Sequence, residues 1–422
     1  MDNVTINPAD ARQLSGGALV AALRDSRART WALVADLTPA QWVPPLLDGV
    51  NPIAWELAHL AWFAEFWVLR GPHGRDGDGQ ATARHPARFA GPDAHFDSAR
   101  LLHPARWTTP MPTRGDLENM LANQLGTCIE ALPTASTTSA ADAKGASDDA
   151  LYFHRLALFH EDMHGEAFCW LRATLGYPAP GGMAVPQVPP SRPVWVRGGG
   201  IQLGSHAGAA GFALDNERPG LEVTVPDFEI DSAPVTALEF AQFVNAGGYD
   251  QPRYWPGEAG AWRAQSGLSH PQHWRHDPKN SAHAQWQMRW FDGWLELTPD
   301  LPAMHLNAYE AEAYCCWAGR RLPTAAEWEY AATTKTPQKM GDDNSFHWGH
   351  SVWEWTADTF KPYPGFAPGP YREYSAPWFG DHRELRGGAF ATHARLHDVR
   401  YRNFFLPNRT DIFSGFRTVA PC

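Results

Sequence analysis

The sequence predicts a multidomain protein of mixed class, with an all-helical N-terminal domain followed by an α+β domain. The chain has 422 residues, which is more than one hydrophobic core usually organises. Residues 1–177 are dominated by amphipathic helical periodicity. Residues 178–193 are rich in proline and glycine, and short β-type runs, turns and tryptophans prevail beyond them. We therefore expect domains at residues 1–177 and 194–422, joined by a linker at residues 178–193.

The helical half contains four segments with the pattern of long helices, at residues 17–37, 52–70, 114–132 and 150–175. The second segment opens on Asn51-Pro52, a favourable cap and first-turn pair. The stretch 71–113 is too long for a turn, and Thr134 to Asp149 form a low-complexity insert. Four amphipathic helices with one long crossover predict a four-helix bundle.

The second half of the chain has weaker helical signals. Residues 306–319 and 324–333 predict two helices. Residues 250–300 and 335–390 are interpreted as long irregular stretches, which in a compact domain usually serve function or are built on their own packing.

Composition and charge exclude several classes of partner. A formal net charge of −11 without any Lys/Arg block argues against nucleic acid. No apolar run approaches the roughly 18 residues of a transmembrane helix, so we expect no membrane partner. Met1 to Thr5 lack the basic and apolar regions of a secretory signal. The adjacent Cys315 and Cys316 are poorly placed for a disulfide, which favours a reduced cytoplasmic location.

Three histidines give the strongest functional signal. His160 and His164 are four residues apart on a predicted helix, so both imidazoles leave one face and can reach a single metal ion. His59 lies on another predicted helix of the bundle. Two helices that supply three imidazoles leave metal positions open for a substrate or oxygen, which suits catalysis. Glu166 is offset around the helix from both His160 and His164, so we assign it a supporting or ion-pairing role.

Aromatic residues accompany His59 on its helix. Trp55, Trp62 and Trp67 are interpreted mainly as bundle core, although aromatic walls also attract a trimethylammonium group. In the second half, Asn403 could hold a substrate carboxylate or ammonium, and Arg409 could bind an anion or sugar hydroxyls. A turn stabilised by Asn403 with a solvated Arg409 explains the same residues equally well.

The chain resembles a known family over nearly its whole length. The first half is similar to DinB-type bundles and carries their His-x-x-x-His-x-Glu motif as His160, His164 and Glu166. The second half resembles the formylglycine-generating-enzyme type, a C-type-lectin-like α+β fold. The segments that carry this resemblance are Val194–Gly199, Asp215–Pro219, Ala318–Tyr330, Val352–Thr356 and Leu385–Gly388. The pairing of the two domains is similar to ergothioneine and ovothiol sulfoxide synthases and to the related selenoneine synthases.

The resemblance implies a mononuclear non-haem Fe(II) enzyme that uses O2. Such enzymes join sulfur or selenium to the imidazole carbon between the ring nitrogens of histidine or of hercynine, its trimethylated betaine. By position, the iron ligands are His59, His160 and His164. The residues implied to contact substrate are Asn403, Phe404, Phe405, Arg409 and Phe366.

Departures from the family pattern concern the second substrate. Members that accept γ-glutamylcysteine have Asn-Trp-Asp where this chain has Asn403-Phe404-Phe405, and Phe366 falls where they have a tyrosine. The sequence around His59, residues 50–59, is closer to the selenoneine synthases. We therefore expect hercynine and a selenosugar as small-molecule substrates, in a reaction that leads to selenoneine.

Other functions remain open at this point. An ergothioneine-type sulfoxide synthase would join hercynine to a thiol. A zinc-dependent DinB-type thiol transferase would use the same three histidines, because these ligands do not choose iron over zinc. A non-catalytic lectin-like binding protein would need no metal. Formylglycine formation is disfavoured, since no reactive cysteine pair lies near residues 402–417.

Overall fold

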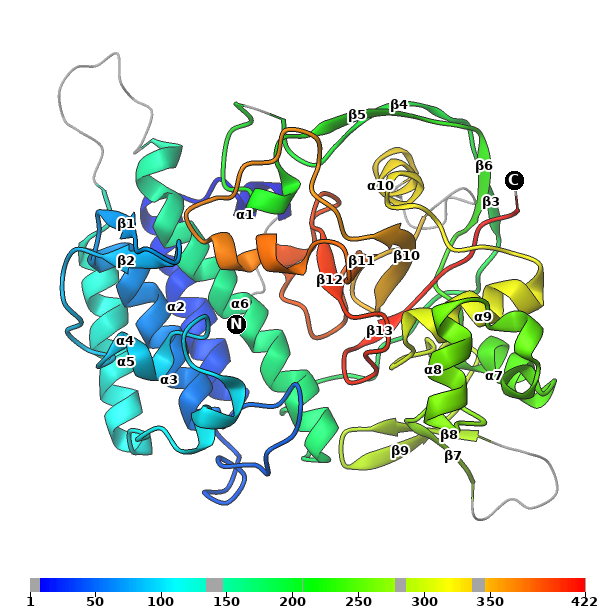
Figure 1. Ribbon diagram of the computed structural model, residues 1–422, viewed down its shortest axis with the longest axis horizontal. Helices are drawn as coiled ribbons and strands as arrows, with labels where there is room; N and C mark the ends of the chain where they lie inside the picture. Colours follow the sequence, from blue (N-terminus) through cyan, green and yellow to red (C-terminus); the bar gives the residue numbers. More distant parts are fainter. Residues whose placement is uncertain (1–7, 134–146, 207, 278–285, 336–345, 422) are drawn as a thin grey trace. The chain divides into compact units, whose positions relative to one another are not determined.

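The computed structural model describes residues 8–133, 147–206, 208–277, 286–335 and 346–421. The chain forms two compact units (Figure 1). The helical unit extends to Leu171 and also includes two short segments from later in the sequence, Ala209–Ala213 and His393–Leu396. The α+β unit holds the rest of the chain. Most of the low-complexity insert, residues 134–146, lies outside the described residues.

The helical unit is built on four long helices that lie side by side (Figure 1). They are α2 (Gly16–Ala32), α3 (Ile53–Ala64), α5 (Arg114–Glu130) and α6 (Asp148–Leu175). The predicted helices are thus confirmed, but the first ends at Ala32, five residues early, and the second continues beyond Ala64 as a π-helical turn, η1 (Glu65–Leu69). A short helix α1 (Pro8–Ala11) precedes them.

Helix α3 is buried at every one of its residues, because apolar side chains surround it on all sides. The crossover that follows contains the β1 (His73–Arg75) and β2 (Ala81–Ala83) hairpin, α4 (Asp93–Phe96) and the 3₁₀ turn η2 (His103–Trp107). It is fastened to the end of α3 by Glu65, whose buried carboxylate accepts backbone N–H groups of Arg88, Phe89 and Ala90.

The α+β unit contains one four-stranded sheet and three smaller ones among its described residues. The strands of the four-stranded sheet lie in the order β12 (Asn403–Phe405), β11 (Arg383–Arg386), β10 (Trp353–Thr359) and β13 (Ser414–Gly415). Only the β10–β13 pair of this sheet is parallel. The smaller sheets pair β3 (Pro193–Val196) with β6 (Phe228–Asp231), β4 (Gly199–Leu203) with β5 (Leu221–Val225), and β7 (Trp274–His276) with β8 (Trp286–Trp290) and β9 (Gly293–Glu296).

The helices of this unit are α7 (Ala237–Asn245), α8 (Glu258–Ser266), α9 (Ala308–Ala318) and α10 (Ala325–Thr334). The predicted helices at residues 306–319 and 324–333 are therefore confirmed as α9 and α10. The interpretation of residues 250–300 and 335–390 as irregular was wrong, since α8 and the β7–β9 sheet lie in the first stretch and strands β10 and β11 lie in the second. Apolar and polar residues alternate along Trp286–Trp290, which is a short strand signal that the sequence carried. The 3₁₀ turns are η3 (Asp215–Glu217), η4 (Gly248–Asp250), η5 (Pro252–Tyr254), η6 (Arg372–Tyr374), η7 (Ala376–Trp378) and, in the helical unit, η8 (Ala394–Leu396).

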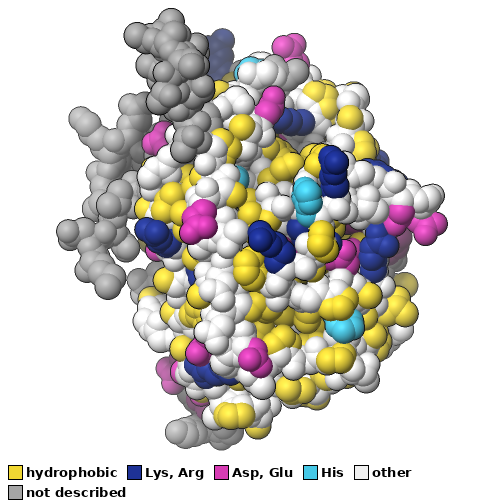
Figure 2. Space-filling view, turned by 90° about the vertical axis from the view of Figure 1, so that its left-hand side faces the viewer, with side chains coloured by type: hydrophobic (Ala, Val, Ile, Leu, Met, Phe, Trp, Pro, Cys, Tyr) yellow, Lys and Arg dark blue, Asp and Glu magenta, His cyan; other side chains and the backbone are white. Residues whose placement is uncertain are grey.

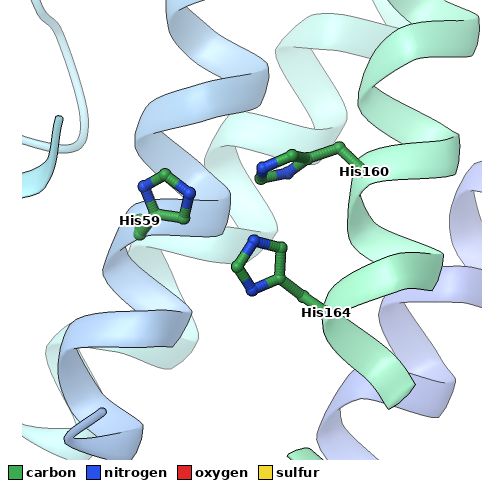
Figure 3. A group of neighbouring side chains, drawn as sticks. All are labelled: His59, His160 and His164. Atoms are coloured by element: carbon green, nitrogen blue, oxygen red, sulfur yellow. The ribbon is translucent and has the colours of Figure 1, made fainter. Parts of the chain in front are cut away.

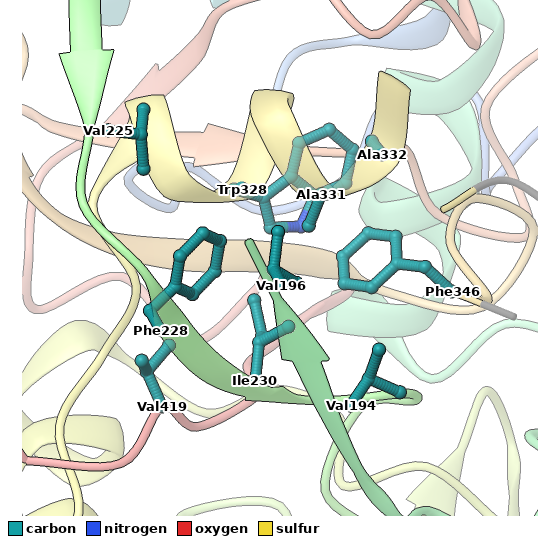
Figure 4. Packing of buried hydrophobic residues seen from close by; sticks show 10 residues of the cluster. All are labelled: Val194, Val196, Val225, Phe228, Ile230, Trp328, Ala331, Ala332, Phe346 and Val419. Carbon is teal, nitrogen blue, oxygen red and sulfur yellow. The ribbon is translucent and has the colours of Figure 1, made fainter. Parts of the chain in front are cut away.

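One core of the α+β unit lies between the β3–β6 pair and helix α10 (Figure 4). Successive side chains of a strand point to opposite faces, so alternate residues of β3 and β6 enter the core. Trp328 of α10 fills the space above them, and its indole N–H donates to buried Glu354 at 2.8 Å. The labelled core residues are Val194, Val196, Val225, Phe228, Ile230, Trp328, Ala331, Ala332, Phe346 and Val419.

Charge is dispersed over the face drawn in Figure 2. On the face in Figure 2, basic and acidic side chains of the described residues are interspersed, and neither sign gathers into a patch. No helix within the described ranges is long and apolar enough to cross a bilayer.

Arg395 fastens its short segment into the helical unit. Its guanidinium forms two hydrogen bonds to Asp162 of α6, at 2.7 and 2.9 Å, and one to Asp25 of α2 at 2.7 Å. Asp162 also accepts from the hydroxyl of Ser26 at 2.8 Å. Burial alone would raise the pKa of Asp162, but hydrogen bonding and ion pairing with Arg395 lower it below its ordinary value.

We expect Arg395→Met to destabilise the helical unit by about 3–5 kcal/mol, because Asp162 would remain as a buried charge without its cation. Hydrogen exchange of peptides from α2 and α6 measures this effect. The control is Asp25→Ala, which removes only the ion pair between Arg395 and Asp25. The Asp25 side chain is 60% exposed, so its loss should cost less than about 1 kcal/mol. Equal protection in the two variants would contradict the structural role of the Asp162 pair.

Candidate metal centre

Three imidazoles converge between two helices of the helical unit. His59 comes from α3, and His160 and His164 come from successive turns of α6 (Figure 3). One nitrogen from each ring can be chosen so that all three lie within 4.8 Å of one another. The ring centroids are 4.4–5.2 Å apart, and both His59 and His160 are buried. The structure therefore brings together the three residues that the sequence selected.

Hydrogen bonds fix which nitrogen of His59 and of His164 can face a metal. His59 Nδ1 lies 2.7 Å from the carbonyl oxygen of Phe96, and His164 Nδ1 lies 2.8 Å from a carboxylate oxygen of Glu56. Both partners are acceptors, so each Nδ1 carries the hydrogen and each Nε2 keeps its lone pair. His160 is oriented by stacking on Phe63, with ring centroids 3.5 Å apart and planes within 4°.

The environment keeps two of the rings neutral. Burial lowers the pKa of His59 and of His160 well below the ordinary value, and the neighbouring histidines lower both further. Neutral imidazole is the form that binds a metal ion, so the site does not have to expel protons from these two rings. Three neutral nitrogen ligands with positions left open fit zinc, iron or a related first-row ion.

Aromatic rings close the site on the α3 side. Trp55 stacks on His59 with centroids 5.1 Å apart and planes within 7°, and Trp62 lies at 5.7 Å. Both indoles are buried and already donate their N–H groups, to the carbonyl of His95 and to Asp93. Trp55 and Trp62 thus form walls that keep water from His59.

Two other predicted residues of the helical unit lie apart from this arrangement. Trp67 stacks on Phe153, at a centroid distance of 5.4 Å, and belongs to the core. Glu166 is buried on α6 but is not a member of the ligand cluster found among the described residues.

Glu56 was not predicted from the sequence as a residue of the site. It is buried and accepts a hydrogen bond from His164. A signal was available, because Glu56 precedes His59 by three residues and so shares its face of α3. The carbonyl of Phe96 could not have been found, since any residue of the crossover has one.

The candidate substrate residues of the α+β unit lie on strand β12 and the turns near it. In the antiparallel register, Leu385 faces Asn403, Glu384 faces Phe404 and Arg383 faces Phe405. Neighbouring residues of a strand alternate, so Asn403 and Phe405 share one face and Phe404 occupies the other.

Phe404 stacks on Phe360, with centroids 4.1 Å apart, and all three residues of β12 are partly buried. Phe366 is also partly buried and packs edge-on against Phe379 at 5.1 Å. Both Phe404 and Phe366 therefore have aromatic partners within their own unit.

Arg409 is paired inside its own turn. Its guanidinium forms two hydrogen bonds to the carboxylate of Asp411, at 2.9 and 2.5 Å, and lies 4.6 Å from the ring centroid of Phe405. Asn403 accepts the backbone N–H of Phe404 at 2.9 Å. These residues therefore present an aromatic face beside a neutralised cation.

Two family models match the chain. The DinB superfamily matches residues 22–168, and the sulfatase-modifying factor enzyme 1-like domain matches residues 182–351 and 347–421. A hercynine oxygenase of Mycolicibacterium thermoresistibile is 32% identical, over 94% of this chain and 93% of that protein. The chain belongs to this family.

Further relatives agree with the assignment. The hercynine oxygenase of Mycolicibacterium smegmatis is 31% identical over 87% of this chain and 90% of that protein. A formylglycine-generating enzyme of Streptomyces coelicolor is 28% identical and covers 57% of this chain and 94% of its own length. The predicted pairing of a DinB-type helical domain with a formylglycine-generating-enzyme-type domain is confirmed.

We expect His160→Ala to abolish stoichiometric metal binding, because only two imidazoles would remain at the centre. Anaerobic loading with Fe(II) or Zn(II), desalting and metal analysis provide the measurement. The matched control is His154→Ala, a buried histidine of the same helix whose ring contacts the carbonyl of Cys128 at 3.0 Å instead. Retention of one tightly bound ion by His160→Ala would show that the three histidines are not its ligands.

Proposed function

We propose that the protein is an Fe(II)- and O2-dependent enzyme that joins the selenium of a selenosugar to the imidazole ring of hercynine, in a reaction leading to selenoneine. The observation that carries the proposal is the convergence of His59, His160 and His164, two of them with Nε2 turned to the common centre, in a member of the hercynine oxygenase family. The names of the relatives support hercynine as the first substrate.

The proposed reaction is an oxidative coupling. The imidazole C–H bond and the Se–H bond break, and a C–Se bond and one Se–O bond form. The second oxygen atom of O2 leaves as water, so that four electrons pass to O2. Bound iron would supply the electron transfer to O2 and a Lewis-acidic position for the chalcogen.

The residues of the chain prepare this chemistry. His59, His160 and His164 would hold the ion, and a three-residue ligand set would leave room beside it for both reactants, which would bring the atoms to be joined close together. Trp55 and Trp62 cover His59 and exclude water from that side. Exclusion of water limits the loss of reactive species to hydrolysis and uncoupled oxidation.

The preference for a sugar donor rests on Phe405 and its surroundings. We propose that Asn403, Phe404, Phe405, Arg409 and Phe366 contact the substrates. Phe405 offers no carboxylate to an amino-acid ammonium, and a buried ammonium without a partner costs several kcal/mol. A sugar with an acetylated amine has no such charge, and its ring can pack on an aromatic face. A selenol is also a stronger acid than a thiol, so a larger fraction of it is present as the anion at neutral pH.

We expect the highest kcat/KM with hercynine and a selenosugar, and a lower value with the corresponding thiosugar. With γ-glutamylcysteine we expect kcat/KM to be at least 10-fold lower than with the selenosugar, which corresponds to about 1.4 kcal/mol or more of lost binding. Fe(II)-loaded protein is mixed with O2 and each donor, and the products are identified by mass spectrometry. Equal or better efficiency with γ-glutamylcysteine would instead establish the second candidate, an ergothioneine-type sulfoxide synthase, which the names of the relatives favour. Donor consumption by the zinc form without O2 would establish a thiol transferase.

Phe405→Asp should raise the relative kcat/KM for γ-glutamylcysteine by about 10-fold or more, because a carboxylate at this position can pair with the donor ammonium. The measurement is the ratio of the two donor efficiencies within one preparation, which removes differences in folded fraction. Leu406→Asp, at the neighbouring exposed position, adds the same charge and should leave the ratio unchanged. An equal change in both variants would mean that overall charge, and not position 405, governs donor choice.

A further inference from the structure

A continuous chain of hydrogen bonds leads from the surface of the helical unit to His164. Arg106 Nη1 donates to Asn51 Oδ1 at 2.7 Å, and Asn51 Nδ2 donates to Glu56 Oε2 at 3.2 Å. The other oxygen of Glu56 faces His164 Nδ1 at 2.8 Å. The side chain of Glu56 is 2% exposed, so water does not compete for its carboxylate.

The guanidinium of Arg106 and the carboxylate of Glu56 together determine which atom donates in each of these hydrogen bonds. A guanidinium can only donate and a carboxylate can only accept. The amide of Asn51 must therefore turn its oxygen to Arg106 and its NH2 group to Glu56. His164 must in turn donate from Nδ1, which leaves Nε2 for a ligand bond.

We propose that Asn51, Glu56 and Arg106 form a positioning relay that sets the tautomer and the donor strength of His164. This inference rests on the proposed metal-binding role of His164, and it adds residues that determine how that ligand binds. A carboxylate on the distal nitrogen of a histidine ligand orients the ring and raises its basicity.

The relay makes His59 and His164 differ in how strongly they donate electrons to a metal. His59 is anchored by a neutral backbone carbonyl, whereas His164 is anchored by a carboxylate. His164 is therefore the more strongly donating of the two. Arg106 connects both, since its guanidinium also lies 4.1 Å from the ring centroid of Trp55, which stacks on His59.

Glu56→Gln tests the directionality. Because Arg106 keeps the oxygen of Asn51, the NH2 group of Asn51 still points to residue 56 and takes the oxygen of the new glutamine. The glutamine must then turn its own NH2 group to His164, so Nδ1 of that ring becomes an acceptor and its hydrogen moves to Nε2. In that tautomer the ring cannot bind a metal through Nε2.

The first measurement needs no metal. Nitrogen-15 NMR of metal-free protein with labelled histidine distinguishes a protonated Nδ1 from a protonated Nε2, and His164→Gln assigns the signals. We expect the Nδ1–H form in the wild type and the Nε2–H form in Glu56→Gln. An unchanged tautomer in Glu56→Gln would overturn the relay.

The second measurement is the affinity for Co(II) or Fe(II) by competition with a chelator. Glu56→Gln should lose about 10- to 100-fold in affinity. The matched control is Glu65→Gln, which makes the same substitution at another buried carboxylate, in η1. The Glu65 carboxylate accepts the backbone N–H groups of Phe89 and Ala90 and does not contact a histidine of the site. The control should lose stability but retain metal affinity, and an equal loss of affinity in both variants would contradict the proposal.

A rescue experiment separates the relay from simple damage. Asn51→Ala combined with Glu56→Gln removes the donor that forces the glutamine to turn, so its oxygen can again accept from His164. We expect the double variant to bind metal more tightly than Glu56→Gln alone and to regain the Nδ1–H tautomer. Additive losses would overturn the inference. If wild-type protein binds no metal while the tautomers behave as described, the proposed function fails and the relay stands.

Discussion

The complete burial of α3 is the constraint on which the helical unit depends. A buried polar group must find its hydrogen bonds inside the protein. Glu65 meets this requirement with backbone N–H groups of residues 88–90, and His59 meets it with the carbonyl of Phe96. The crossover between α3 and α5 is therefore held in place by His59 of α3 and by Glu65, the first residue of η1. The same requirement at Glu56 is met by His164 and Asn51, and so joins α3 to α6 beside the candidate metal centre.

Helix α6 is held from more than one direction over the turns that carry the candidate ligands. His160 and His164 leave one face, and Asp162, two residues from each, leaves the opposite face. Asp162 is fixed by Arg395, and Glu161 is fixed by Arg27 of α2 at 2.6 Å. A rotation of α6 that moved the imidazoles would have to break buried ion pairs, which is strongly unfavourable. Residues that do not touch the site, Asp162 and Glu161, thus add to the direct contacts that orient the imidazoles.

The sequence predicted those features that repeat locally. Helical periodicity located α3 and α6, and the four-residue spacing of His160 and His164 identified the centre. Contacts between residues far apart in the chain leave no such pattern. Arg395 is 233 residues from Asp162, and nothing in the segment His393–Leu396 marks it as part of the helical unit. The β7–β9 sheet was missed for another reason, because its strands are only three to five residues long.

The local structure around β12 shows what the departure from the family pattern at position 405 changes. Asn403 and Phe405 share a face of the strand, and the guanidinium of Arg409 covers the ring of Phe405 while it is neutralised by Asp411. An aspartate at position 405 would place a second carboxylate beside the guanidinium of Arg409, which Asp411 already neutralises, so one negative charge would remain to attract a donor ammonium. With phenylalanine there, this part of the unit presents an apolar ring and a satisfied ion pair. Such a surface suits a ligand that carries hydroxyl groups and a ring better than one that carries an ammonium, and the proposed preference for a sugar donor rests on this difference.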